Sequence, residues 1–519
     1  MKNPDRIFTI SAAFFSIAYV LLRFWGLADS CLWFDEIFGV HAAEQEFRAM
    51  LWFVAQDLIH PPLFYILLKG WIAIGGESVF WLRSFSVFFA AASLAPFLLL
   101  CKELKISFTA RIIALAFFSV SGSLIKYAQE VRMYSLLLFL SLASTWLFAR
   151  FFFRGKNIWI LTLVNILLVY THYFGWLVVA SEIAAILIFQ RIKIRHVLIM
   201  FGILAVSYVP WVWAILQATG TGANVEQNIG WIEKPGIRSI LDFAFDIVEP
   251  FYFQETSISA SSILVVTIPL VLLIAIAKVN YFVNWRHHAD MSKFLLLAVF
   301  TLPILLAFVL SWMFPVSIWG SRHLISIFPP VMILIGMLID AIDIKAAKGV
   351  FVSVIIGLFA VGFAFRMQTQ KPDFIWCAWE QHAKDWILTE HYSPDPKTLY
   401  VFEDLIAYHF WFATRGLQNY RVKVVRGVEG ITEDKAYFLP RGFGQIEVVG
   451  LDDISDDDIW TAFRDPKAEQ TPPGFLDFTP QPIPISAFAK SGYDPEDSKT
   501  IDVGDQSAYL IHLLRRRRD

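Results

Sequence analysis

Charge is scarce in this 519-residue chain: Asp, Glu, Lys and Arg make up only 17% of it, against 57% hydrophobic and 16% aromatic residues. Such a balance excludes an ordinary soluble protein and indicates a membrane protein. The formal net charge is −2, and the cations are spread over separate loops instead of one basic face, so we expect no nucleic acid as a partner. A glycine-rich phosphate loop after a strand is also missing, which excludes a nucleotide site of that kind.

Cysteine is scarce as well. The chain has only 3 cysteines, and no two of them have the spacing of metal ligands, which excludes a cysteine-based metal centre. Cys31 and Cys377 could pair in a disulfide outside the membrane, but we expect the alternative of two unpaired thiols. A small-residue cleavage site is missing after the first apolar run, so this run is expected to remain as a transmembrane helix.

Long apolar runs dominate the chain instead. They recur from Ile7 to Met367, and each approaches the roughly 20 residues that a helix needs to cross the hydrocarbon of a membrane. They predict a mainly α, polytopic membrane protein with about 11 transmembrane helices. The predicted spans cover residues 7–27, 79–101, 109–125, 131–153, 157–171, 173–190, 196–217, 259–283, 293–314, 323–343 and 349–368. Asn165 and Glu182 lie within two of these spans, where we expect hydrogen bonds between helices.

The segment from Pro61 to Ile74 is apolar but short, so it is either a further span or a helix in the outer interface. Lys and Arg decide between these alternatives, because they accumulate in short cytoplasmic loops. If Pro61 to Ile74 lies in the interface, 16 Lys and Arg residues fall on the inner side. Only 8 then fall on the outer side up to Arg322, although the outer segments are longer. A full crossing would reverse this bias. We therefore predict a cytoplasmic N-terminus, an outer loop at 28–78 with an interfacial helix at 61–74, and an extracytoplasmic tail.

The composition changes after residue 368, where Asp, Pro, Lys and Glu become frequent and membrane-length runs end. We predict a membrane module at 1–368 and a soluble extracytoplasmic α/β domain at 369–519. Periodicity in this domain predicts helices at 379–389 and 405–414 and strands at 398–402, 420–425, 436–439 and 508–514.

Two adjacent carboxylates, Asp35 and Glu36, follow the first apolar run. Bulky apolar residues flank them on both sides: Trp33, Phe34, Ile37 and Phe38. Apolar surroundings disfavour the charged form of a carboxylate and suit it to accept a proton. Asp35 is therefore the candidate general base for a hydroxyl or amine acceptor, with Glu36 positioning it or binding the acceptor. The alternative is that both are charges at a helix end in a polar loop.

His60 precedes Pro61 and Pro62, whose rings restrict how the chain enters the next helix. The histidine could cap this turn, donate to a phosphate, or bind a divalent metal together with Asp35 and Glu36. We expect no cofactor, and a metal at these three residues is the alternative.

Lys126, Arg132 and Tyr134 lie where one predicted helix ends on the outer side and the next begins. The two cations could reach the lipid interface as extended side chains. They could also bind a phosphate group, which a guanidinium grips with two hydrogen bonds.

His172 and Tyr173 lie in a second outer turn, where tyrosines are common as aromatic-belt residues. Arg322 and His323 precede the tenth predicted span. An arginine in so short a loop is favoured as a ligand of a lipid phosphate, so we expect Arg322 to act with Arg132 and Lys126.

Several of these motifs follow one another in a fixed order on the predicted outer face. After the acidic pair come His60-Pro-Pro-Leu63, Gln129-Glu-Val-Arg-Met-Tyr134, Thr171-His-Tyr173, and Arg322 ahead of an apolar helix with two prolines. Over residues 5–368 this order resembles the bacterial relatives of the protein O-mannosyltransferases and the lipid A aminoarabinose transferases, which are integral membrane glycosyltransferases of the GT-C fold.

The resemblance implies a glycosyltransferase of the bacterial cytoplasmic membrane, surrounded by membrane lipids, with its soluble domain in the periplasm. It implies a polyprenyl-phosphate-linked sugar donor and a glycan, lipid or protein acceptor, with Asp35 as base and with Arg132 and Arg322 on the donor phosphate. A second acidic motif of the oligosaccharyltransferase kind is missing, which speaks against a metal-dependent mechanism. The alternative is a binder or transporter of lipid-linked sugars, which would use the same cations but not the carboxylates.

Overall fold

The computed structural model describes residues 4–189, 194–223, 225–252, 260–283, 291–368, 374–389, 395–428, 444–466, 484–504 and 506–516. The chain forms two compact units. The first comprises Met1–Ala28, Glu46–Gly222 and Ile232–Gln370, and the second comprises Asp29–Gln45, Ala223–Trp231 and Lys371–Asp519. The second unit therefore includes Asp29–Gln45, a segment that the sequence analysis placed in the membrane module.

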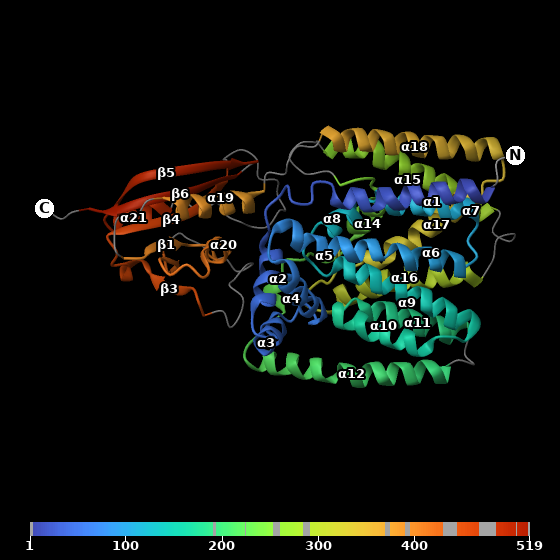
Figure 1. Ribbon diagram of the computed structural model, residues 1–519, viewed down its shortest axis with the longest axis horizontal. Helices are drawn as coiled ribbons and strands as arrows, with labels where there is room; N and C mark the ends of the chain where they lie inside the picture. The colour runs from blue at the N-terminus through green and yellow to red at the C-terminus, as the bar shows by residue number, and fades with distance from the viewer. Residues whose placement is uncertain are drawn as a thin grey trace. The chain divides into compact units, whose positions relative to one another are not determined.

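The first unit is helical (Figure 1). Its elements are α1 (Pro4–Phe24), α3 (Phe47–Asp57), α4 (Leu63–Gly75), α5 (Val79–Ala92), α6 (Leu94–Glu103), α7 (Phe108–Val120), α8 (Gly122–Ala128), α9 (Tyr134–Arg154), α10 (Ile158–Thr171), α11 (Gly175–Phe189), α12 (Ile194–Gly220), α14 (Ile237–Val248), α15 (Ala260–Val283), α16 (Met291–Met313), the 3-10 turn η3 (Ile325–Ile327), α17 (Phe328–Asp340) and α18 (Lys345–Gln368).

Every predicted span overlaps a helix of this unit. The span 79–101 falls on α5 and α6 together, and the span 109–125 crosses the break at Ser121 between α7 and α8. Among the described residues, 6 helices are long and apolar enough to cross a membrane. Large apolar side chains are exposed on the surface of these helices; Trp213 of α12, for example, is 63% exposed. This is expected for a surface that faces lipid instead of water. The chain is a multi-pass membrane protein. The helix α4 forms as expected, and its place in the outer interface stays a prediction.

The helices α7 and α17 pack closely because a glycine lies between them. A Cβ atom added to Gly336 of α17 would lie 2.3 Å from the carbonyl oxygen of Ala110 in α7, so only glycine permits this approach. Small residues allow such contact between membrane helices, where close packing replaces the hydrophobic effect as the driving force. The start of α17 is thereby fixed near the end of α7, and Arg322 and His323 lie in the loop just before η3 and α17.

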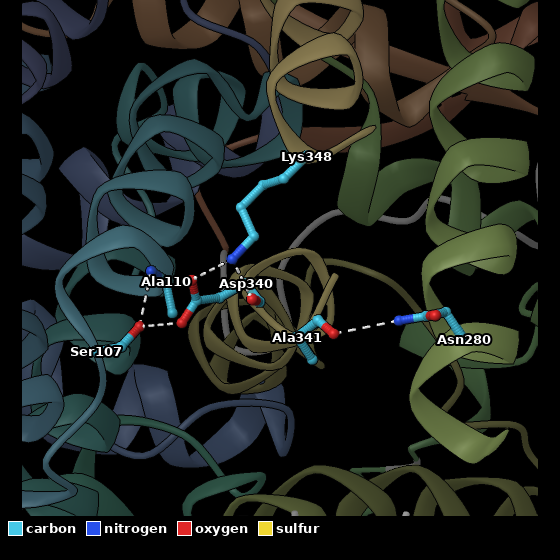
Figure 2. Close-up of polar contacts among 6 residues, drawn as sticks. All are labelled: Ser107, Ala110, Asn280, Asp340, Ala341 and Lys348. Carbon is cyan, nitrogen blue, oxygen red and sulfur yellow. Dashed lines mark hydrogen bonds and ion pairs between the residues drawn. The ribbon is translucent and has the colours of Figure 1, made fainter. Parts of the chain in front are cut away.

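At the opposite ends of these helices, polar contacts join four helices (Figure 2). Asp340 at the end of α17 accepts a hydrogen bond from Ser107 Oγ at 2.5 Å and pairs with Lys348 Nζ of α18 at 3.0 Å. Asn280 of α15 donates to the carbonyl oxygen of Ala341 at 3.2 Å. These contacts fix the register of α7, α15, α17 and α18 at the end that we predict to face the cytoplasm.

A buried hydrogen-bonded triad joins α9, α10 and α11. Ser144 Oγ lies 2.5 Å from Asn165 Oδ1 and 2.6 Å from Glu182 Oε1, and Asn165 Nδ2 donates to Glu182 Oε2 at 2.8 Å. A hydroxyl has one hydrogen and can donate to only one of two oxygens. The second contact therefore needs a hydrogen on Glu182, and we predict that its carboxyl group is protonated. The expected hydrogen bonding between these helices is confirmed.

We expect the substitution Glu182→Gln to leave thermal unfolding nearly unchanged, because a glutamine amide can donate to Ser144 and accept from Asn165 just as the protonated acid does. The substitution Glu182→Leu leaves two buried polar groups without this partner and should destabilise the membrane unit by roughly 1–3 kcal/mol. Unfolding of the two variants in the same detergent tests this. If Glu182→Gln unfolds as early as Glu182→Leu, the carboxyl group is ionised and our assignment is wrong.

The second unit is a mixed α/β structure. Its elements are α2 (Phe34–Glu44), α13 (Glu226–Ile229), α19 (Ile375–Leu388), β1 (Lys397–Val401), α20 (Asp404–Thr414), β2 (Tyr420–Arg426), β3 (Glu447–Gly450), the 3-10 turn η4 (Leu451–Asp453), β4 (Asp458–Pro466), α21 (Pro484–Lys490), β5 (Tyr493–Val503) and β6 (Gln506–Arg515). The strand order is β3-β2-β1-β4-β6-β5. Strands β3, β2, β1 and β4 are parallel, whereas β6 pairs antiparallel with β4 and with β5.

Successive side chains of β1 point to opposite faces of the sheet, so this strand contributes to a hydrophobic core on each face. Leu399 and Val401 pack with Trp379 and Trp386 of α19, while Tyr400 joins the cluster that contains Phe488 of α21. The predicted elements at 379–389, 398–402, 405–414, 420–425 and 508–514 are confirmed as α19, β1, α20, β2 and β6. The predicted strand at 436–439 lies outside the described residues.

Helix α2 is attached to this unit by a disulfide. Cys31 and Cys377 are bonded, with their Cα atoms 5.2 Å apart, so our expectation of two unpaired thiols was wrong. A separation of 346 residues is why no local pattern indicated the pairing. Polar contacts continue the attachment: His41 Nδ1 lies 2.7 Å from the Tyr408 hydroxyl of α20.

Candidate functional site

Histidine and arginine side chains from four separate segments gather in the first unit. We call the following five residues the His–Arg cluster: His60, Arg132, His172, Arg322 and His323. They come from the loop between α3 and α4, the turn before α9, the turn between α10 and α11, and the loop before η3. The ring of His172 lies 5.3 Å from that of His60 and 5.5 Å from that of His323, centroid to centroid.

Short-range backbone contacts position these side chains. His172 ends α10 with an extended backbone, and its Nδ1 accepts a hydrogen bond from the amide of Phe174 at 3.1 Å. His323 Nδ1 donates to the carbonyl oxygen of Ile318 at 3.2 Å. Arg132 lies in a tight turn in which its amide donates to the carbonyl oxygen of Glu130 at 2.8 Å. Each residue is therefore held at a helix end by the chain next to it.

Burial and the two guanidinium groups keep the three histidines neutral. Burial, and after it the charges of Arg132 and Arg322, lower the pKa of His172 to about 3. Burial is also the largest cause that lowers the pKa of His60 and of His323, and the same arginines add to it. At neutral pH the arginines are the charged members of the His–Arg cluster. Its chemistry is that of an anion site with neutral polar groups around two fixed positive charges.

Tyr134 lies next to the His–Arg cluster, whereas Tyr173 contacts Trp211. The buried ring of Tyr134, at the start of α9, lies 6.4 Å from the ring of His172 and 6.5 Å from that of His323. Tyr173 accepts a hydrogen bond from Trp211 Nε1 at 3.4 Å. Burial raises the pKa of the Tyr173 hydroxyl, and the charge of Asp57 raises it further.

Lys126 lies beside a second pair of carboxyl groups, Asp246 and Glu249, which the sequence analysis did not single out. Burial and the charge of Asp246 raise the pKa of Glu249 to about 7, against the opposing effect of Lys126. Ser321, next to Arg322, lies 3.3 Å from the hydroxyl of Tyr127. In the sequence, the signal that could have pointed to this pair is that Asp246 and Glu249 lie three residues apart at the end of an amphipathic helix.

Asp35 and Glu36 belong to the second unit, where they form the first turn of α2. Glu36 is fully buried and its Oε2 accepts a hydrogen bond from the backbone amide of Trp33 at 3.2 Å. This contact caps the start of α2, so Glu36 determines where the helix begins. Asp35 is half-buried beside it. In the part of the chain that is described, no group of three or more His, Cys, Asp and Glu residues is arranged to hold a metal ion.

The helical unit and the mixed sheet together define a multi-pass membrane protein with the GT-C fold, as the resemblance in sequence implied. No protein-family model and no curated protein matches the sequence. Two solved structures of ArnT from Cupriavidus metallidurans match nearly the whole chain.

The ArnT structure bound to undecaprenyl phosphate is 11% identical with a TM-score of 0.57, and the apo structure is 10% identical with a TM-score of 0.53. Each match covers 96% of this chain and 97% of the ArnT chain. An oligosaccharyltransferase from Archaeoglobus fulgidus, solved with zinc and sulfate, matches with 12% identity and a TM-score of 0.46. That match covers 78% of this chain and only 61% of the archaeal one.

Proposed function

We propose that this protein is a glycosyltransferase that moves a sugar from a polyprenyl-phosphate-linked donor to an acceptor on the outer face of the cytoplasmic membrane. The observation that carries the proposal is the His–Arg cluster, in which two arginines and three neutral histidines gather at helix ends of a GT-C membrane unit. ArnT of the same fold binds undecaprenyl phosphate, which supports a lipid-linked phosphate as the ligand here.

The proposed reaction is a direct displacement at the anomeric carbon with inversion. Asp35 takes the proton of the acceptor hydroxyl or amine, the acceptor atom bonds to the anomeric carbon, and the bond from that carbon to the phosphate oxygen breaks. The electron pair stays on this oxygen. The phosphate therefore gains one negative charge during the step, and fixed cations stabilise the transition state more than the donor.

Arg132 and Arg322 are the groups that we assign to the developing charge, and Lys126, which lies beside Asp246 and Glu249, is a further candidate cation. Glu36 supports Asp35 by fixing the first turn of α2, which favours its positioning role over binding of the acceptor. Comparing envelope material from cells with and without the chain identifies the acceptor, which is a glycan, a lipid or a protein.

The disulfide between Cys31 and Cys377 supports the predicted topology. Disulfides persist in oxidising compartments such as the bacterial periplasm and are rare in the cytoplasm. The first outer loop and the C-terminal domain both carry one of these cysteines, and we accordingly assign both to the extracytoplasmic side.

Binding of undecaprenyl phosphate to the purified protein tests the assignment of the arginines. The substitutions Arg132→Gln and Arg322→Gln should each weaken binding roughly 10- to 100-fold, the range for a lost hydrogen bond between charged groups. Arg238→Gln is the matched control, because the Arg238 side chain is 95% exposed in α14 of the same unit. Equal affinities for Arg132→Gln and Arg238→Gln would refute the phosphate site.

A further inference from the structure

The tautomer of His172 is determined by its backbone neighbour. An amide N–H can only donate, so Nδ1 of His172 accepts from Phe174 through its lone pair. A neutral imidazole has one hydrogen, which must then be on Nε2. His172 consequently offers one N–H donor on the side of the ring that faces away from this contact.

This donor is buried without a protein acceptor. His172 is 3% exposed, and its Nε2 has no hydrogen-bond partner among the residues that the structure describes. Buried donors are nearly always paired in folded proteins, because an unpaired one is costly. Such a group therefore points to an acceptor that a ligand supplies.

The surroundings of His172 determine which ligand fits. The charges of Arg132 and Arg322 are close enough to lower the pKa of His172, and they would attract an anion to this place. The nearest histidine rings belong to His60 and His323, and His323 uses its own N–H on the carbonyl oxygen of Ile318. An anion with several oxygens, such as a phosphate ester, could accept from both guanidinium groups and from His172 at the same time.

We propose that His172 donates its Nε2 hydrogen to an oxygen of the donor phosphate that Arg132 and Arg322 hold. This inference rests on the proposed function for the identity of the phosphate as part of a polyprenyl lipid. The arginines supply charge, which attracts any anion. The single fixed donor of His172 adds direction, because it selects an orientation in which a phosphate oxygen meets the ring nitrogen.

Two substitutions separate this role from a structural one. In His172→Asn the amide oxygen can replace Nδ1 as acceptor for Phe174, but the donor at Nε2 is lost. In His172→Gln the side-chain amide can reach the position of Nε2 and donate, but the contact with Phe174 is lost. We expect undecaprenyl phosphate to bind roughly 10- to 100-fold more weakly to His172→Asn than to the wild type, and His172→Gln to retain most of the affinity.

A purely structural role of His172 predicts the opposite order, with His172→Asn close to the wild type and His172→Gln impaired, and that result would overturn the inference. Thermal unfolding of both variants shows whether the fold is kept.

Three probes distinguish failure of this inference from failure of the proposed function. The wild type should bind undecaprenyl phosphate more tightly than undecaprenol, which has no phosphate. If it does and the two variants bind alike, His172 is not a donor but the phosphate site stands. If the expected order of variants appears only with inorganic phosphate, His172 binds free phosphate, and the lipid-linked donor of the proposed function is wrong.

Discussion

Sugar transfer should fall by roughly 100- to 10,000-fold in the Asp35→Asn variant, while binding of undecaprenyl phosphate stays close to that of the wild type. This is the range that general-base catalysis contributes. Asparagine has nearly the same shape as aspartate but cannot take a proton from the acceptor. The substitution leaves Arg132 and Arg322 unchanged, and these arginines are the groups that we assign to the donor phosphate, so we expect donor binding to be independent of this change.

Three further variants sharpen this prediction. Asp29→Asn removes an exposed carboxylate of the same unit and should leave transfer unchanged. Glu36→Gln keeps an oxygen that can accept from the amide of Trp33, so it should retain more activity than Glu36→Leu, which cannot cap α2. Full turnover by Asp35→Asn, measured with the same donor and acceptor, would show that another group is the base.

Loss of the disulfide should have the second large effect. It closes a loop across 346 residues, and removal of such a bond from a domain typically costs about 2–5 kcal/mol of stability. The substitution Cys31→Ser should therefore lower the unfolding temperature of the second unit. Transfer should fall with it, because the bond holds the segment that leads into α2, and α2 carries Asp35.

The single and double variants provide the control. Cys31→Ser, Cys377→Ser and the double variant all remove the same bond, so their losses of stability should be nearly equal and not additive. Cys101→Ala removes the one other cysteine, which is free and buried in α6 of the first unit, and should not reproduce the effect on the second unit. If the double variant lost as much stability as the two single variants together, the two cysteines would not be bonded to each other.

The membrane helices could be predicted from the sequence because the signal is local. An apolar run of about 20 residues can span the bilayer wherever it occurs in the chain, and the sequence therefore indicates α9 and α16 clearly. The helix α3 was missed because it is short: its continuous apolar run, Ala49 to Ala55, is far below the length of a membrane span. The strand β5, Tyr493–Val503, was missed because it is an edge strand whose many charged residues hide its pattern.

The candidate site could be predicted only in part. Arg132, His172 and Arg322 each had a local reason to be noticed, but nothing in the sequence showed that their helix ends meet. The tautomer of His172 depends on the amide two residues later, which only coordinates reveal. The attachment of α2 to the C-terminal domain was not expected either. The bond between Cys31 and Cys377 was only the less favoured alternative, and nothing pointed to the contact between His41 and Tyr408, because both join segments hundreds of residues apart.

Release of free polyprenyl phosphate is the most direct measurement of the central claim. Lipid-linked sugars from cells that lack this chain serve as donors and envelope material as acceptor, with the purified protein in lipid vesicles. We predict one polyprenyl phosphate released for each sugar transferred by the wild type, and almost none for Asp35→Asn. Recovery of the sugar still attached to its lipid, in wild-type vesicles supplied with acceptor, would contradict the account and identify a binder or transporter of lipid-linked sugars.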